Sequence, residues 1–146
     1  MLDKKDKIML RQIIMEHYTE PENKGILTDA KNSFIKFQDS QSCADAIDVQ
    51  IIYEDSKIVD ARFDGVSCSI SGAAVDILCS LVKNKTKQEA LKYLNNYHNM
   101  ITGKEYDEES LGELIVFWEI HHQGNRINCA LLGADGIRSI LENEVK

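Results

Sequence analysis

Two runs of alternating apolar and polar residues stand near the middle of the chain, at residues 46–54 and 59–64. The polar pair Asp55-Ser56 lies between them. Alternation with a period of two is typical of half-buried strands, and a short polar connection favours an antiparallel hairpin. We expect the hairpin to cover residues 47–63, and weaker alternation predicts another short strand at 32–38. In the first run, Ile47, Val49, Ile51 and Tyr53 are expected to face one way, and in the second, Val59, Ala61 and Phe63 are expected to share one side.

The apolar spacing changes after Cys68 from two residues to three and four. This spacing predicts a helix over residues 69–83, and a similar stripe predicts a first helix over 4–18. Thr86 and Glu89 form a capping-box pattern that opens a helix over 87–95. A last helix is expected over 127–141, although it contains Gly133 and Gly136. Each of these glycines lowers helix stability by up to about 1 kcal/mol relative to alanine.

The segment between these helices has two parts with different composition. Residues 100–109 are acidic and predict a loop, whereas residues 111–120 are strongly apolar and predict a helix or a partly helical lid. The overall order is helix, strands, then helices. This order indicates one α+β domain, 1–146, with a small antiparallel sheet covered by helices on one face.

Composition and charge exclude several classes of protein. Of 146 residues, 43% are hydrophobic and 28% are charged, which is ordinary for a soluble globular chain. No apolar run approaches the roughly 18 residues of a membrane span, and the N-terminus lacks the pattern of a secretory signal. The net charge of −7, without a basic block, argues against a nucleic-acid surface. We therefore expect a cytoplasmic protein with neither membrane nor nucleic acid as its partner.

Four cysteines form the candidate chemistry, and in a cytosolic chain they are not expected to form disulfides. Cys43, Cys68 and Cys129 each lie near the predicted end of an element, and Asp45 lies beside Cys43. Three thiolates and a carboxylate suit zinc, and the same thiolates suit an iron–sulfur cluster. Spacing alone leaves three unrelated cysteines equally open. Cys79, well inside an apolar helix, is expected to be a core thiol.

Several motifs resemble those of the NifU/IscU-like iron–sulfur cluster assembly scaffold family, over nearly the whole chain. The matching stretches are residues 17–25 (HYTEPENKG), 42–45 (SCAD, with Ala44 where the family has glycine), 65–71 (GVSCSIS), 103–107 (GKEYD) and 126–130 (RINCA). Asn128 before the third cysteine, in place of a histidine, and a longer segment between the second and third cysteines are similar to the SufU branch. In that branch, residues 100–125 are expected to form a subfamily insertion or lid.

The resemblance implies a zinc-dependent sulfurtransferase of iron–sulfur cluster biogenesis. It implies that Cys43, Asp45, Cys68 and Cys129 bind zinc and that Cys43 receives sulfur from a pyridoxal-phosphate cysteine desulfurase, supported by Arg126. A histidine of the desulfurase is expected to replace Cys43 at the metal. Downstream assembly or acceptor proteins are the other expected partners.

Two alternatives remain open at this point. The same cysteines suit a scaffold that holds a nascent iron–sulfur cluster, or an adaptor whose zinc is only structural. His121 and His122 are expected to be a loop pair rather than ligands, and Trp118 a packing residue. His17 is either a cation at a helix end or a residue that faces a partner.

Overall fold

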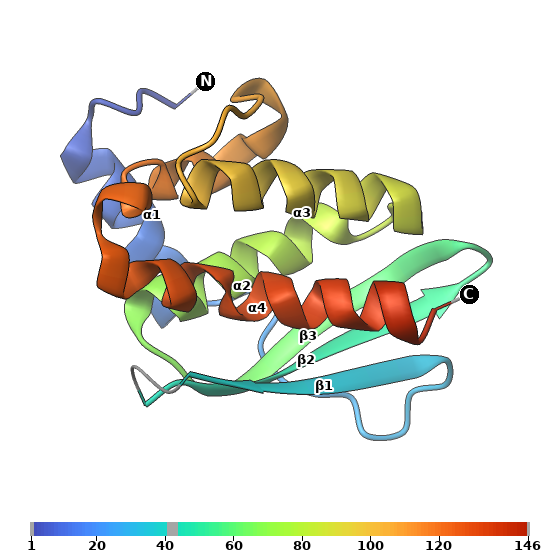
Figure 1. Ribbon diagram of the computed structural model, residues 1–146. Helices are drawn as coiled ribbons and strands as arrows, with labels where there is room; N and C mark the ends of the chain where they lie inside the picture. The colour runs from blue at the N-terminus through green and yellow to red at the C-terminus, as the bar shows by residue number, and fades with distance from the viewer. Residues whose placement is uncertain (1, 41–43, 146) are drawn as a thin grey trace.

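Three strands form one antiparallel sheet in the order β1 (Ser33–Asp39), β2 (Ala46–Glu54) and β3 (Lys57–Val66). The computed structural model describes residues 2–40 and 44–145. All the helices lie on one side of the sheet (Figure 1). They are α1 (Lys7–Thr19), α2 (Ser69–Val82), α3 (Lys87–Ile101), η1 (Glu109–Phe117), η2 (Ile120–His122) and α4 (Gly124–Asn143). The predicted α+β class is therefore confirmed.

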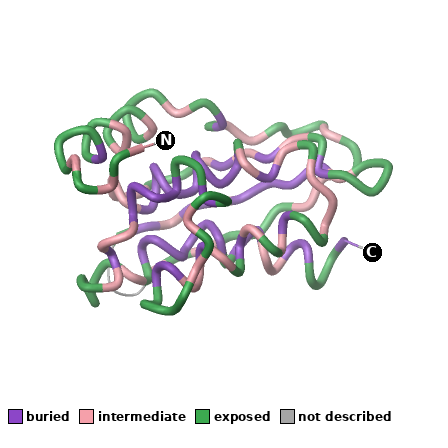
Figure 2. Tube along the Cα trace, turned by 90° about the horizontal axis from the view of Figure 1, so that it is seen from above, coloured by how far each residue is buried: buried purple, intermediate pink, exposed green. Residues whose placement is uncertain are grey.

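The helices are arranged in layers above the sheet. Helix α4 packs on β1 and β2, α2 packs on β3, α1 packs against α2, and α3 lies over α4. Buried residues run through the middle of the molecule, and exposed residues occupy most loops and ends (Figure 2). No helix in the described ranges is long and apolar enough to cross a membrane.

The predicted hairpin is present, but one of its faces differs from the prediction. Asp55 and Ser56 both have positive φ, 52° and 64°, as two-residue hairpin turns of the favoured type require. The register shifts after Ile52, which pairs with Asp60, whereas Tyr53 pairs with Ile58. This bulge turns Val59 outward, where it is 44% exposed, and buries Ile58 instead. The prediction that Val59 shares a side with Ala61 and Phe63, which are both buried, is therefore wrong.

Helix boundaries shift where caps and core contacts determine them. Helix α1 begins at Lys7 rather than residue 4 because the Asp6 side chain accepts a hydrogen bond from the Met9 amide. The capping box at Thr86 is confirmed. Helix α3 continues to Ile101, well past residue 95, so Met100 and Ile101 are buried helix rather than acidic loop.

The apolar segment at 111–120 is irregular, and much of it belongs to the core. It forms 3-10 helix interrupted at Gly112, which has a φ of 53°. Leu111, Leu114 and Phe117 are fully buried. Trp118 packs as expected: its indole Nε1 donates to the Lys4 carbonyl, 2.9 Å away, and the Lys4 ammonium lies over its ring.

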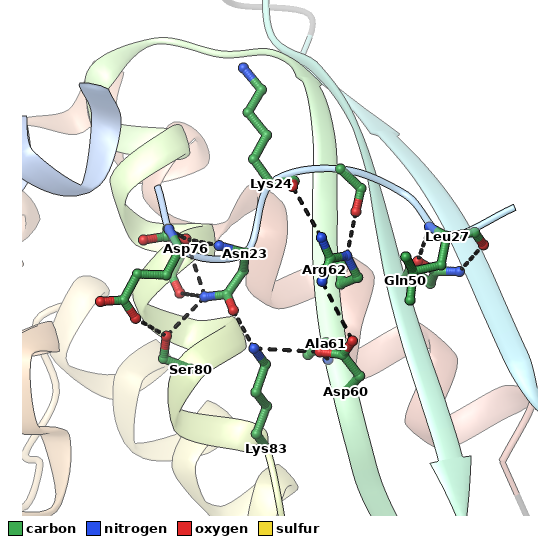
Figure 3. Close-up of polar contacts among 12 residues, drawn as sticks. Asn23, Lys24, Leu27, Gln50, Asp60, Ala61, Arg62, Asp76, Ser80 and Lys83 are labelled. Atoms are coloured by element: carbon green, nitrogen blue, oxygen red, sulfur yellow. Dashed lines mark hydrogen bonds and ion pairs between the residues drawn. The ribbon is translucent and has the colours of Figure 1, made fainter. Parts of the chain in front are cut away.

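The face of the sheet opposite the helices is partly covered by the loop between α1 and β1. The loop first runs along the free edge of β3, where the Gly25 amide donates to the Phe63 carbonyl and the Phe63 amide donates to the Asn23 carbonyl. On that face Gln50 is fully buried, and its side-chain amide is satisfied by hydrogen bonds with both backbone groups of Leu27 (Figure 3). This loop carries residues 20–25 of the 17–25 motif, whose first three residues end α1, so the motif is held against β3 and α2.

Candidate metal centre

Three of the four predicted metal ligands converge at one end of the sheet. Asp45 immediately precedes β2, Cys68 precedes α2, and Cys129 lies in α4. One ligand atom from each lies within 4.8 Å of those of the other two. Asp45 and Cys129 are buried, and Cys68 is half-buried. Asp45 and Cys68 are 23 positions apart in the sequence, and Cys68 and Cys129 are 61 apart, so local spacing did not reveal that they form one cluster.

Asp45 orients Cys68 as well as offering a ligand. Its Oδ1 accepts the Cys68 backbone amide at 2.7 Å, and the Cys68 thiol lies 3.7 Å from Oδ2. Cys68 is the N-cap residue of α2, and the Ser71 amide donates to its sulfur at 3.4 Å. The first backbone amides of a helix have no partner within the helix, so the Cys68 sulfur lies where they can donate hydrogen bonds to it.

Cys129 does not share this position at a helix N-terminus. We expected it at the start of the last helix, but α4 begins at Gly124, so Cys129 lies in the second turn. The backbone amides that have no partner within a helix lie in its first turn. Helix α4 therefore places the Cys129 sulfur beside Cys68 without the help of free helix amides.

The donor set of the cluster fits a metal ion. Two cysteine sulfurs and one carboxylate oxygen are typical zinc ligands, and zinc takes four in structural sites. Cys43, the predicted fourth ligand and sulfur acceptor, lies outside the described residues.

The remaining site candidates occupy different positions. Arg126 is exposed one helical turn before Cys129, and no hydrogen bond or ion pair joins its side chain to another described residue. Its supporting role stays a prediction. Cys79 is fully buried in α2, where burial raises the pKa of its thiol far above the ordinary value, as a core thiol requires. His121 and His122 stack on each other and do not belong to the described ligand cluster.

Sequence reasoning missed the importance of Tyr18 for the geometry of the site. Its hydroxyl donates to the carbonyl of Ser67 at 3.1 Å, directly before the candidate ligand Cys68. Gly72 makes room for this contact, because a Cβ there would lie 2.6 Å from the Ser67 hydroxyl oxygen and 2.9 Å from the Tyr18 ring. The HY pair in the first motif was the available signal.

Asp76 is a second residue that sequence reasoning missed. It is fully buried in α2, and its Oδ1 accepts the backbone amides of Glu22 and Asn23 at 3.0 and 2.9 Å (Figure 3). Its Oδ2 lies 2.6 Å from Nδ1 of His17, and Nε2 of His17 lies 3.0 Å from Glu113. An acidic residue within the apolar stripe of residues 69–83 was the signal. Asp76 thus anchors both the end of α1 and the 17–25 motif to α2.

Comparison with known proteins agrees with this architecture. Residues 9–142 match the family described as NifU-like N terminal domain. The zinc-dependent sulfurtransferase SufU of Bacillus subtilis (strain 168) is 34% identical over 125 residues, covering 85% of this chain and 83% of that protein. The iron–sulfur cluster assembly scaffold protein IscU of Thermotoga maritima is 24% identical over 136 residues, covering 93% of this chain and 94% of that protein.

A solved structure gives the same result. The crystal structure of an iron–sulfur cluster assembly scaffold protein for the SUF system from Fervidobacterium islandicum AW-1 superposes with a TM-score of 0.81 at 32% identity. The match covers 92% of this chain and 95% of that one. Family, relatives and fold agree: the chain belongs to the family of NifU-like N-terminal domains.

Proposed function

We propose that this protein is a zinc-dependent sulfurtransferase of iron–sulfur cluster biogenesis that works in the cytoplasm with a pyridoxal-phosphate cysteine desulfurase. The observation that carries the proposal is the convergence of Asp45, Cys68 and Cys129 within 4.8 Å. The similarity to a SufU protein named for zinc-dependent sulfur transfer supports it.

Asp45, Cys68 and Cys129 would hold zinc, with Cys43 as the fourth ligand. When bound, zinc supplies positive charge that keeps thiols deprotonated without adding redox chemistry. The chain's own groups prepare the site: Asp45 orients the Cys68 backbone, and the Ser71 amide donates to the Cys68 sulfur.

Cys43 is the proposed sulfur acceptor. Its thiolate attacks the outer sulfur of the desulfurase persulfide, forming a new S–S bond on Cys43. The old S–S bond breaks, and the desulfurase cysteine leaves as a thiolate. Two electrons of the attacking thiolate form one bond while the other bond's pair leaves with the desulfurase sulfur, so no external oxidant is needed. Arg126 would stabilise thiolate near the site through charge-assisted hydrogen bonds.

A scaffold that holds a nascent iron–sulfur cluster is the second candidate. It would use Cys43, Cys68 and Cys129, and the similarity to an IscU scaffold over 93% of this chain favours it. Asn128 favours the first candidate. Scaffold members of the family have a histidine directly before the third cysteine, and this chain has Asn128 there. An adaptor with purely structural zinc is the third candidate.

Metal analysis combined with desulfurase turnover tests these candidates. The protein is expressed without added metal, its zinc, iron and acid-labile sulfide are measured, and it is then incubated with desulfurase and cysteine. One zinc, faster turnover and a sulfur on Cys43 by mass spectrometry are the expected results. Iron with acid-labile sulfide would identify the scaffold, and zinc without persulfide would identify the adaptor.

Two cysteine variants make the experiment specific. Cys43→Ser should abolish sulfur acceptance with the fold intact, because serine cannot form a persulfide. Cys79→Ser is the control, since Cys79 is buried in the core away from the ligand cluster. Unchanged turnover in Cys43→Ser, with sulfur on another residue, would move the acceptor role elsewhere.

A further inference from the structure

A groove of about 440 Å³ opens between α1, α2, η2 and α4. Its apolar floor includes Leu10, Ile70 and Val116, and Leu10 and Val116 are buried. Its rim carries Lys7 and Arg11 from α1 and Arg126 from α4. A surface with an apolar floor and a charged rim resembles a protein docking site, where an apolar centre is surrounded by polar groups.

The three rim cations are exposed, and among the described residues no acidic side chain pairs with them. None of their side chains forms an ion pair or hydrogen bond with another residue in the described ranges, whereas Lys4 pairs with Glu108, and Lys83 with Asp60. Of the described residues that line the groove, Glu119 alone is acidic. In a chain of net charge −7, a local excess of positive charge attracts carboxylates and opposes the overall field.

The groove adjoins the ligand cluster along two elements. Ser69 lines it and directly follows the ligand Cys68, and Arg126 lies one helical turn before the ligand Cys129. A protein segment seated in the groove would hold its parent protein beside the metal centre. The rim cations come from two helices rather than from a single turn, so they suit several carboxylates along a segment better than one small anion.

We propose that this groove binds an amphipathic segment of the sulfur-donating desulfurase, with an apolar side chain on the floor and carboxylates against Lys7, Arg11 and Arg126. The inference rests on the proposed function and adds to it the chemistry by which the partner is recognised. Charges at the rim of an interface act chiefly on the association rate and on its dependence on salt.

Charge reversal at the rim tests this proposal. Affinity for the holo-desulfurase and sulfur transfer from it are measured for the wild type, Lys7→Glu, Arg11→Glu and the control Lys92→Glu. Lys92 lies on α3, outside the groove, and its reversal makes the same change in net charge. Each rim reversal should weaken binding by about tenfold or more and flatten its salt dependence, because like charges would face each other. Lys92→Glu should bind as the wild type does.

Zinc content and far-UV circular dichroism are measured for every variant, and both should match the wild type. One outcome would overturn the groove proposal alone: the wild type binds the desulfurase and accepts its sulfur, and the rim variants bind the desulfurase as tightly as Lys92→Glu does. A wild type that binds the desulfurase but takes no sulfur would overturn the proposed function, and weaker binding of the rim variants would still support the groove. A wild type that does not bind the desulfurase would overturn both. Displacement of the desulfurase by free dicarboxylates at micromolar concentration would contradict a peptide occupant and indicate a small-anion site.

Discussion

Asp45 acts on the candidate centre in two ways, as a donor oxygen and as the acceptor for the Cys68 amide. A carboxylate is a harder donor than a thiolate, and zinc in sulfur-rich sites prefers sulfur. We therefore predict that Asp45→Ala keeps part of the zinc, whereas Cys68→Ala and Cys129→Ala lose most of it. Competition with a chromophoric chelator measures the affinity.

An isosteric variant separates the two roles of Asp45. Asp45→Asn keeps an oxygen for the Cys68 amide, so its zinc affinity should lie between those of the wild type and Asp45→Ala. Complete loss of metal in Asp45→Ala would show that the ranking of ligands is wrong. Unchanged affinity in that variant would remove Asp45 from the ligand set.

Tyr18 positions Cys68 from the opposite side, through the carbonyl of Ser67. Removing the hydroxyl in Tyr18→Phe should cost about 1 kcal/mol of stability. Because Ser67 adjoins Cys68, a candidate ligand, zinc affinity should also fall severalfold, whereas a purely structural tyrosine would leave it unchanged. Tyr53→Phe is the control: Tyr53 is half-buried in β2, away from the cluster. Equal zinc affinity in the two variants would refute a positioning role for Tyr18.

At the scale of elements, His17 joins α1 to Asp76 of α2 and Glu113 of η1. Burial alone would lower the pKa of His17, but hydrogen bonds and charge from the two carboxylates outweigh it and raise the pKa above 6.5. A histidine whose pKa is raised by folding stabilises the folded state fully at pH values below its pKa in the unfolded chain. This stabilisation is lost as the pH rises through its pKa in the folded protein.

We therefore predict that His17→Gln is destabilised most near pH 6 and less at pH 9. The loss near pH 6 should be about 2 kcal/mol, as expected when a buried carboxylate loses a charged partner. Urea unfolding of both proteins at each pH measures it. His122→Gln serves as the control, because His122 is exposed in η2 and takes no part in the pairs of His17 with Asp76 and Glu113. A loss in His17→Gln that is constant from pH 6 to 9 would contradict the ion-pair account.

Helix α4 shows why propensity alone misjudged two glycines. A Cβ at Gly133 would lie 2.5 Å from Cγ2 of Val75, and one at Gly136 would lie 2.7 Å from Cγ2 of Val49. These glycines allow α4 to approach α2 and the sheet closely. Glycine lowers the intrinsic stability of the helix by up to about 1 kcal/mol relative to alanine, but a residue with a Cβ would prevent this close packing.

Gly133→Ala should therefore destabilise the protein by about 1 to 3 kcal/mol, since overpacking outweighs the better helix propensity of alanine. Gly124→Ala in the same helix is the matched control, because a Cβ at that position would meet nothing within 4 Å. It should be neutral or slightly stabilising. Urea denaturation provides both values, and equal stability of the two variants would argue against close packing at Gly133.

The sequence was informative wherever a local pattern determines local structure. Residues 46–54 were predicted with the boundaries that β2 has, and the capping box placed the start of α3. Prediction was less accurate where contacts between residues distant in the sequence determine the local structure. The bulge at Val59 depends on pairing with β2, and η1 is irregular because Gly112 interrupts it while its leucines fill the core.

In the candidate site, too, local patterns were predicted and distant contacts were not. The residue types and order of Asp45, Cys68 and Cys129 were predicted from the motifs, but their meeting depends on the whole fold. Asp76 and Tyr18 act through contacts with residues 49 to 59 positions away, so no spacing rule could assign them partners.

At the scale of the whole molecule, one metal ion at this cluster would join the sheet, α2 and α4, which are far apart in the sequence. The unfolded chain has no such preformed site, so metal binding stabilises the folded state by mass action. At a free metal concentration of 100 times the dissociation constant, this contribution is about 2.7 kcal/mol.

We predict that a strong chelator lowers the Tm of the zinc-loaded protein by roughly 5 to 10 °C, given the size of the domain. Cys129→Ala should melt lower at the outset and show no further shift with chelator, because its site is already broken. Cys79→Ala should also melt lower, since it leaves a cavity in the core, yet it should keep the full chelator shift. Differential scanning calorimetry with and without chelator distinguishes these patterns. If Cys79→Ala lost the shift and Cys129→Ala kept it, the metal would be bound elsewhere than at Asp45, Cys68 and Cys129.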